Sequence, residues 1–161
     1  MKRSPIFSAL TAAAISVFAV TPASSQTFDY LEQPDIDAPI LNNLAIKDLN
    51  AGNAQAALEK LDKAIEIKRS LPEAWSNRCI ANIQLNFISR AIADCMQARH
   101  LNPNQSEAYY NLAYARAKIG QFSEAIDELK LYIKLKPDDP DPYGALVKYH
   151  RYFLEIGRAH V

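Results

Sequence analysis

Glycine is scarce in this sequence, and positive charge is not in excess. The four glycines are scattered, so no glycine-rich phosphate-binding loop is present. Lys and Arg number 18, as do Asp and Glu, and no basic block offers the electrostatic footprint that nucleic acid requires. No stretch shows the sustained alternation of apolar and polar residues that predicts a strand. These absences disfavour nucleotide-binding and nucleic-acid-binding classes and leave a helical protein with a mixed-charge surface.

Histidine is also scarce, and no catalytic or metal-binding constellation is recognisable. His100 and His150 have no cysteine or carboxylate at metal-ligand spacing. Asp138, Asp139 and Asp141 stand among prolines, where helix capping is favoured over calcium because the ordered alternate-ligand loop is missing. We therefore expect no enzyme activity, no metal and no cofactor.

The long uncharged run lies at the N-terminus. Two basic residues precede an uncharged segment at 6–20, and small residues follow it, which is the layout of a secretory signal peptide. The alternative is a membrane anchor, but about 15 uncharged residues fall short of the roughly 20 that a spanning helix needs. We expect residues 1–25 to be removed by cleavage after Ala23 or Ser25, and residues 26–37 to form a linker. The mature protein would then be secreted or periplasmic, with no membrane span.

The C-terminal residues, 155–161, read EIGRAHV. They match the in-frame translation of a widely used sequencing-adapter DNA. We interpret them as an adapter artefact that begins after Leu154, so that the natural protein continues. The alternative is an ordinary helix end at Gly157.

Between these ends, small and apolar residues recur every 34 positions. Three of the recurring columns are Leu41, Trp75, Tyr109 and Tyr143; Ala45, Cys79, Ala113 and Val147; and Ala57, Ala91 and Ala125. A fixed repeat of this length predicts an array of units, each too small to bury its own apolar face. Within residues 54–67 apolar side chains fall at spacings of three and four, so the units are predicted to be helical.

Turn and capping residues follow the same period. Gly52 and Gly120 share a column with Asn86, and we expect a positive φ at Gly120. Asn53 is expected to cap the helix that follows it. The S-x-x-E pattern that begins at Ser70 predicts a second cap.

The combined pattern resembles the tetratricopeptide repeat (TPR). It has an aromatic residue early in a first helix (A), a glycine-centred turn, alanine in a second helix (B) and a closing proline. The resemblance covers roughly residues 39–152 and implies an all-α, right-handed solenoid of antiparallel helix hairpins. We expect three full repeats, at 38–71, 72–105 and 106–139. Residues 140–154 would form a capping helix or the first helix of a fourth repeat.

Several residues depart from the family pattern. The late helix-A column that is usually Tyr holds Asp48, Asn82 and Arg116. Arg78 stands where the neighbouring repeats have leucine, and Tyr132 occupies a helix-B column that is otherwise alanine. We expect changes in local packing at these positions and no change of fold.

The resemblance also implies a binding surface, because the A helices of this family line a concave groove. The residues it places there are Asn42, Asn43, Ile46, Asn50, Ser76, Asn77, Ile80, Gln84, Glu107, Tyr110, Asn111, Tyr114 and Lys118. The predicted binding residues among them are Asn43, Ile46, Asn77, Ile80, Tyr110, Asn111, Tyr114 and Lys118. A carboxamide can bond both the C=O and the N–H of a passing backbone, so the asparagine column at 43, 77 and 111 predicts a ladder for an extended peptide. Alternatively, the asparagines bond their own scaffold or water, and the tyrosines belong to the core.

Chaperone-binding members of the family grip a C-terminal carboxylate with Lys, Arg and Asn. The corresponding residues here are Asn42, Ile46, Asn77, Glu107 and Asn111. Only Asn77 matches, and Glu107 would repel a carboxylate. We therefore expect a protein or peptide ligand that needs no terminal carboxylate.

Two cysteines, Cys79 and Cys95, fall in facing core columns of the second repeat. In an exported protein they invite a disulfide. The expected hairpin register places Ala91 opposite Cys79 and Cys95 about one turn away, some 5 to 6 Å along the axis. That offset favours two buried thiols over a bridge.

The sequence thus predicts an exported scaffold that binds a protein or an extended peptide in its groove. An alternative is the N-terminal interaction module of a longer enzyme. A third, weaker hypothesis is self-association through Tyr143, Leu146 and Val147, because the seventh helix has no helix B of its own to cover this apolar edge.

Overall fold

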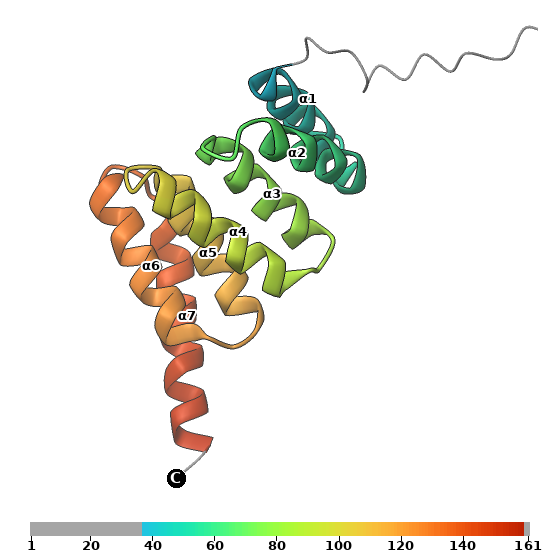
Figure 1. The fold of residues 1–161 in the computed structure, drawn as a ribbon. Helices are drawn as coiled ribbons and strands as arrows, with labels where there is room; N and C mark the ends of the chain where they lie inside the picture. Colours follow the sequence, from blue (N-terminus) through green and yellow to red (C-terminus); the bar gives the residue numbers. More distant parts are fainter. Residues whose placement is uncertain (1–36, 160–161) are drawn as a thin grey trace, which may run out of the picture. The chain divides into compact units, whose positions relative to one another are not determined.

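The described part of the chain, residues 37–159 of a computed structural model, is all α-helical. Its helices are α1 (Ala38–Asn50), α2 (Ala54–Ile67), α3 (Pro72–Gln84), α4 (Ile88–Leu101), α5 (Ser106–Lys118), α6 (Phe122–Leu135) and α7 (Asp141–Ala159). Figure 1 shows them in chain order. The predicted signal peptide and all but the last residue of the predicted linker lie outside the described residues.

The 34-residue period of the sequence is also the period of the helices. The helices α1, α3 and α5 begin at residues 38, 72 and 106, while α2, α4 and α6 begin at 54, 88 and 122. Each helix packs against the next, and α3 also contacts α1 and α5. The predicted all-α array of helix hairpins is therefore confirmed, and α1, α3 and α5 occupy the A positions.

The turn inside each hairpin depends on one left-handed residue. Gly52 and Gly120 have φ of 78° and 79°, as predicted for Gly120, and Asn86 in the same column has φ of 61°. Asparagine is one of the few residues other than glycine that tolerates this conformation. The same turn therefore forms in all three hairpins, although one lacks glycine.

The predicted side-chain caps are wrong. Asn53 is at the N-cap position of α2 but makes no capping hydrogen bond. The helix α3 begins one residue later than the S-x-x-E pattern implies, so Leu71 is at its N-cap and Ser70 lies outside. A backbone hydrogen bond from Leu71 N to Lys68 O closes the preceding turn, and Pro72 has no N–H to satisfy.

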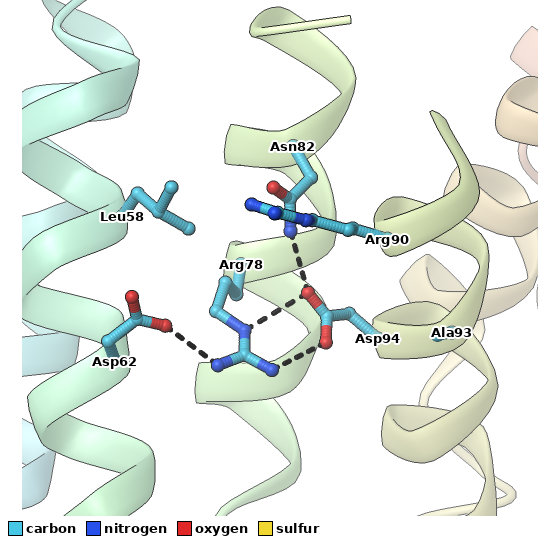
Figure 2. A pocket seen from close by; sticks show the side chains of 7 residues that line it. All are labelled: Leu58, Asp62, Arg78, Asn82, Arg90, Ala93 and Asp94. Carbon is cyan, nitrogen blue, oxygen red and sulfur yellow. Dashed lines mark hydrogen bonds and ion pairs between the residues drawn. The ribbon is translucent and has the colours of Figure 1, made fainter. Parts of the chain in front are cut away.

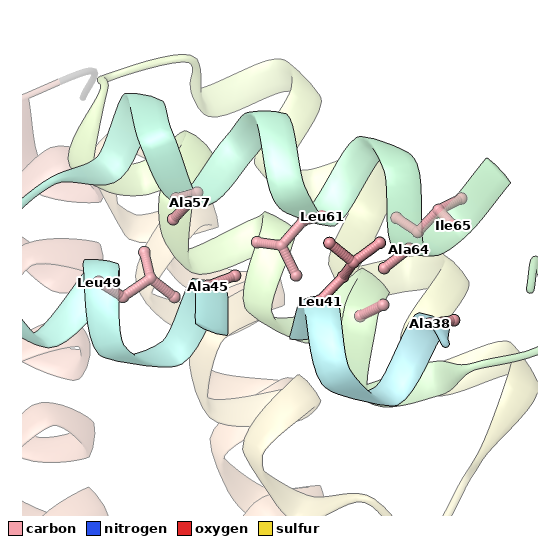
Figure 3. Packing of buried hydrophobic residues seen from close by; sticks show 10 residues of the cluster. Ala38, Leu41, Ala45, Leu49, Ala57, Leu61, Ala64 and Ile65 are labelled. Atoms are coloured by element: carbon pink, nitrogen blue, oxygen red, sulfur yellow. The ribbon is translucent and has the colours of Figure 1, made fainter. Parts of the chain in front are cut away.

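The core of the first hairpin shows why small residues recur. Ala45, Ala57 and Ala64 are fully buried between α1 and α2, and they let the helices approach closely enough for Leu41 and Leu61 to pack between them. Figure 3 shows these two leucines pointing toward one another from facing helices. Alternating small and large side chains fill the interface at the density expected of a protein interior.

The last helix is covered on one face only. Tyr149 is buried, and its ring centroid lies 6.1 Å from that of Phe122 on α6. The residues that continue the recurring columns are exposed instead: Tyr143 is 46% and Val147 71% accessible. The helix extends through Gly157 to Ala159, so the alternative of a helix end at Gly157 is wrong.

Candidate functional site

A cavity of about 470 Å³ opens between the A helices α1, α3 and α5. Its lining residues are Asn42, Asn43, Ile46, Glu73, Ser76, Asn77, Ile80, Gln105, Glu107, Tyr110, Asn111 and Tyr132. We call this cavity the groove. All but two of these residues lie on A helices, because side chains 34 positions apart recur at equivalent places on successive A helices; Gln105 immediately precedes α5, and Tyr132 comes from α6.

Six of the eight predicted binding residues line the groove: Asn43, Ile46, Asn77, Ile80, Tyr110 and Asn111. The other two, Tyr114 and Lys118, are outside it. Tyr114 is exposed, with the Lys118 Nζ 5.5 Å from its ring centroid. It also lies close enough to Tyr149 on α7 to contribute, after burial and Tyr110, to the raised pKa of Tyr149. The last member of the Ile46 and Ile80 column, Tyr114, therefore does not line the groove.

Three lining residues escaped the sequence prediction: Glu73, Gln105 and Tyr132. Glu73 stands 34 residues before Glu107, so the period alone could have identified it. Tyr132 was recognised only as an oversized residue in an alanine column, whereas its side chain reaches the groove from α6. Gln105 carries no repeating signal, and we find none in the sequence that would have identified it.

The asparagine column at 43, 77 and 111 uses some of its hydrogen-bonding groups within the protein. Asn77 Nδ2 donates a hydrogen bond to Asn42 Oδ1 at 2.8 Å, so the scaffold uses one of its donors. Asn43 and Asn111 make no side-chain hydrogen bond to any residue between 37 and 159. Asn77 retains one N–H and its carbonyl oxygen, so each asparagine of the column still has groups available for a ligand.

Two of the most buried polar residues of the groove have unused hydrogen-bonding groups. Asn42 is 6% and Ser76 3% exposed, and both line the cavity. Asn42 accepts from Asn77, and among residues 37–159 no hydrogen bond is found for its Nδ2 or for the Ser76 hydroxyl. Gln105 Oε1 is likewise buried without a hydrogen bond from the described residues. Because buried polar groups are normally hydrogen-bonded, the buried Gln105 Oε1 indicates a surface that meets a ligand or ordered water.

One end of the groove is aromatic. The ring centroids of Tyr110 and Tyr132 lie 5.4 Å apart with planes inclined at 54°. The Tyr132 hydroxyl donates to Asp139 Oδ2. That hydrogen bond, then burial, then the charges of Asp139, Glu107 and Asp141 raise the pKa of Tyr132 to about 12. The tyrosine is held in place as a neutral donor surrounded by carboxylates.

The groove's own charge is negative. Glu73 and Glu107 are its charged lining residues, and both are exposed near the N-termini of α3 and α5. Lys136 Nζ lies 3.9 Å from Glu107 Oε1, but the two side chains are 53% and 60% exposed. An ion pair this open to solvent contributes little and leaves the carboxylate accessible.

A second polar cluster lies between α2, α3 and α4, around a cavity of about 300 Å³ (Figure 2). Arg78 donates to both oxygens of Asp94 at 3.0 and 2.7 Å and to Asp62 at 2.7 Å. Asn82 Nδ2 also donates to Asp94, at 2.8 Å. Burial opposes the charge of Arg78, yet its carboxylate partners outweigh burial and raise its pKa. We call Asp62, Arg78, Asn82 and Asp94 the seam.

The seam explains the departures from the family pattern. Asn82 and Arg78, which replace a usual tyrosine and leucine, provide donors for the buried Asp94. A similar pair joins the second and third repeats, where Arg99 on α4 donates to the buried Glu128 on α6 at 2.7 and 2.9 Å. The charges of the seam satisfy one another, which makes it a structural cluster.

Cys79 and Cys95 form a disulfide between α3 and α4, with a Cα–Cα distance of 5.4 Å. The expectation that favoured two thiols used the wrong hairpin register. Asn82 also meets Asp94 in this hairpin, so α3 residues face α4 residues about one turn later than expected. The turn at residues 85–87 joins these two helices.

Within residues 37–159 no helix is both long enough and apolar enough to cross a bilayer. In the same part of the chain, no group of three or more His, Cys, Asp or Glu side chains is arranged to hold a metal ion.

Residues 83–148 match the family model described as tetratricopeptide repeat. Small glutamine-rich tetratricopeptide repeat-containing protein 2 of Mycosarcoma maydis is 31% identical over 93 residues, which cover 58% of this chain and 26% of that protein. Serine/threonine-protein phosphatase 5 of Rattus norvegicus is 27% identical over 99 residues, covering 62% and 19%. The chain thus spans about a quarter or less of the length of these curated relatives.

Solved structures show the same fold. The first TPR of Spaghetti (RPAP3), bound to the HSP90 peptide SRMEEVD, has a TM-score of 0.71 and 23% identity, covering 73% of this chain and 94% of that one. The Sgt2 TPR domain from Aspergillus fumigatus has a TM-score of 0.71 and 20% identity, covering 78% and 83%. At these identities the likeness concerns the arrangement of the helices.

Proposed function

We propose that this chain, an all-α tetratricopeptide-repeat array, is an exported scaffold that binds a protein or an extended peptide in the groove between α1, α3 and α5. The observation that supports this most directly is one cavity that brings together the polar side chains of Asn42, Ser76, Asn77 and Gln105, with Gln105 Oε1 buried and unpaired among the described residues. An extended backbone offers alternating N–H and C=O groups, and these match a row of carboxamides and hydroxyls.

Hydrogen bonds alone are too weak to hold the ligand. Three neutral bonds of about 0.5 to 1.5 kcal/mol each give only a few kcal/mol, whereas a micromolar complex needs about 8 kcal/mol. Ile46, Ile80 and Tyr110 line the same cavity and supply apolar surface. Burying that surface against ligand side chains provides the remainder.

The ligand needs no C-terminal carboxylate. A structural neighbour is bound to the peptide SRMEEVD, which has acidic residues near its end. In this groove the charged lining residues are Glu73 and Glu107, which repel such a terminus. The surrounding asparagines accept a neutral backbone instead.

The groove assignment is tested by measuring the dissociation constants of peptides selected from a random display library, using fluorescence anisotropy. We expect Tyr110→Ala to weaken binding about tenfold or more and Asn77→Ala by about three- to tenfold. Asn53→Ala is the matched control, because Asn53 is exposed outside the groove. Unchanged affinity in both groove variants, with the helical circular dichroism retained, would rule out the groove.

Export is supported by the signal-like N-terminal sequence and by the Cys79–Cys95 bridge. Disulfides persist in oxidising compartments such as the periplasm and the exterior of the cell. Mass spectrometry of the protein expressed from its own leader should give a mature N-terminus at Ser24 or Gln26. An intact leader in an intracellular fraction would contradict export.

A second candidate is the N-terminal interaction module of a longer enzyme. The curated relatives include a serine/threonine-protein phosphatase, of which this chain matches 19% of the length. Sequencing the complete gene distinguishes the two candidates. A catalytic domain in the same reading frame would favour the module, and a stop codon soon after α7 would exclude it.

Weak self-association through α7 is also proposed. Tyr143 and Val147 are exposed, although the preceding members of their columns, Tyr109 and Ala113, are buried. Contact with a second copy would cover this apolar face. Sedimentation equilibrium at high concentration should then show a dimer that Val147→Glu abolishes, and a monomer in the unmutated chain would contradict the idea.

A further inference from the structure

We propose that the groove selects a peptide carrying a lysine or arginine side chain, which binds beside Glu107 and against the ring faces of Tyr110 and Tyr132. This inference rests on the proposed function, because it names the class of ligand that the same groove takes.

The charged residues that line the groove favour a cationic ligand. The lining includes two carboxylates, Glu73 and Glu107, and no Lys, Arg or His among residues 37–159. The nearby cation, Lys136, is more than half exposed at 3.9 Å from Glu107, so a ligand cation can compete with it for the carboxylate. Complementary charge favours the encounter of a basic peptide and disfavours an acidic one.

Tyr110 and Tyr132 provide aromatic surface for a cationic side chain. Tyr110 and Tyr132 both line the cavity, and their inclined rings offer π-faces to a ligand. A cation over a tyrosine face is attracted by the ring quadrupole. Tyr132 cannot rotate away freely, because its hydroxyl is bonded to Asp139, which also accepts from Asp141 N at 3.0 Å. The carboxylates of Glu107, Asp139 and Asp141 all act on Tyr132, so the aromatic end has a negative field.

The floor of the groove provides an independent indication of a ligand. Asn42 and Ser76 are each more than nine-tenths buried, line the cavity, and have hydrogen-bonding groups without a partner among the described residues. These neutral groups suit the peptide backbone on either side of the cationic residue. The carboxylates are then left for the side chain, which divides the groove into backbone-binding and charge-binding parts.

A metal ion is a less suitable occupant than an organic cation. Calcium takes six to eight oxygen ligands at short range, and no cluster of three or more potential ligands exists in the described part of the chain. An ammonium or guanidinium group needs only one carboxylate and an aromatic face, which the groove provides.

The test begins by panning a phage library of random decapeptides against the immobilised protein. Peptides that lose binding to the Tyr110→Ala variant are groove ligands. These are synthesised with a fluorescent label, as matched pairs in which each Lys or Arg is replaced by Gln. We expect the groove ligands to be enriched in Lys or Arg, and one such replacement to weaken binding about fivefold or more at low salt.

Variants of the protein assign the effect to its carboxylates. Glu107→Gln should bring the two members of each peptide pair to within about twofold of one another, and Glu107→Lys should reverse the preference toward Glu-containing peptides. Glu59→Gln is the matched control, because Glu59 is an exposed α2 carboxylate outside the groove. It should preserve the full preference. Circular dichroism shows whether each variant folds.

The outcomes separate the two proposals. Groove ligands that show no preference for Lys or Arg, or that favour Asp and Glu, overturn the cation inference and leave peptide binding intact. A preference that persists undiminished in Glu107→Gln and Glu107→Lys also overturns it. If no selected peptide depends on Tyr110, the groove function itself fails, and the inference fails with it.

Discussion

The seam and the groove use similar residues in opposite ways. In the seam, Arg78 and Asn82 direct their donors at Asp94 and occupy both carboxylate oxygens, although Asn82 Oδ1 is buried without a hydrogen bond from residues 37–159. In the groove, Asn42 and Ser76 are about as deeply buried as Asp94 but carry no charge, and Gln105 Oε1 is buried without a hydrogen bond from residues 37–159. Charged groups that saturate one another stabilise the fold, whereas neutral polar groups left unpaired along a cavity are available to a ligand or to water.

The comparison predicts its largest effect at Asp94. Asp94→Ala leaves the half-buried Arg78 and the buried Asn82 without their acceptor, and should lower the free energy of unfolding by about 3 to 5 kcal/mol. Urea denaturation measures the loss. The double variant Arg78→Leu/Asp94→Leu should recover most of it, because Leu44 and Leu112 occupy the Arg78 column in the other repeats.

An exposed ion pair serves as the control. Lys130 lies 3.2 Å from Asp127, with both side chains more than half exposed. Asp127→Ala should change the free energy of unfolding by less than about 1 kcal/mol. Equal losses at Asp94 and Asp127 would show that the seam is not a structural cluster.

The next largest effect is expected from the disulfide, which joins α3 to α4. Removing it with Cys79→Ala/Cys95→Ala frees a loop of 16 residues in the unfolded chain. We expect a loss of about 3 kcal/mol in the free energy of unfolding, and a reducing agent should produce a similar change in the unmutated protein. Affinity for groove ligands should change by less than about twofold, because neither cysteine lines the groove.

A smaller effect is expected at Tyr132, the groove residue whose hydroxyl donates to Asp139. Its pKa of about 12 in the folded protein exceeds the ordinary value of 10. The hydrogen bond to Asp139 therefore adds stability that is fully present below pH 10 and is lost as the pH rises through about 12. Asp139→Asn should return the pKa of Tyr132 toward 10, measured by NMR of the ring carbons. An unchanged pKa would mean that Asp139 does not hold the ring.

The hydrogen bond between Tyr132 and Asp139 also affects the stability of the fold at acid pH, through the pKa of Asp139. Its pKa is lowered by the bond from Tyr132, then by the backbone N–H of Asp141. A lowered folded-state pKa contributes stability above the ordinary value, and this is lost as the pH falls through the lowered one. In Tyr132→Phe the carboxyl should titrate closer to its ordinary pKa.

The smallest effect is expected at Ser76. Its buried hydroxyl has no hydrogen-bond partner among residues 37–159, so Ser76→Ala removes a desolvated group without breaking a bond. The free energy of unfolding should stay within about 0.5 kcal/mol or rise slightly. A loss above about 1 kcal/mol would show that the hydroxyl supports the fold, and the contrast between groove and seam would not hold.

Much of the groove was predictable because it follows the repeat. Asn43, Asn77 and Asn111 lie 34 residues apart on helices that start 34 residues apart, so they arrive in one cavity. Tyr132 was not assigned to the groove, because a helix-B residue reaches it only through the length of its side chain. Tyr114 follows the same period but is exposed and does not line the groove.

The sequence by itself determined the period, the helices, the left-handed turn at Gly120 and the burial of the small residues between helices. Each of these depends on spacing along one chain and on local backbone preference. Only the tertiary structure decided the pairings: Asn77 with Asn42, Arg78 with Asp94, and Cys79 with Cys95. A pairing requires two side chains to meet within about 3 Å across different helices. That depends on the register set by the turns, and a shift of one helical turn changes every partner.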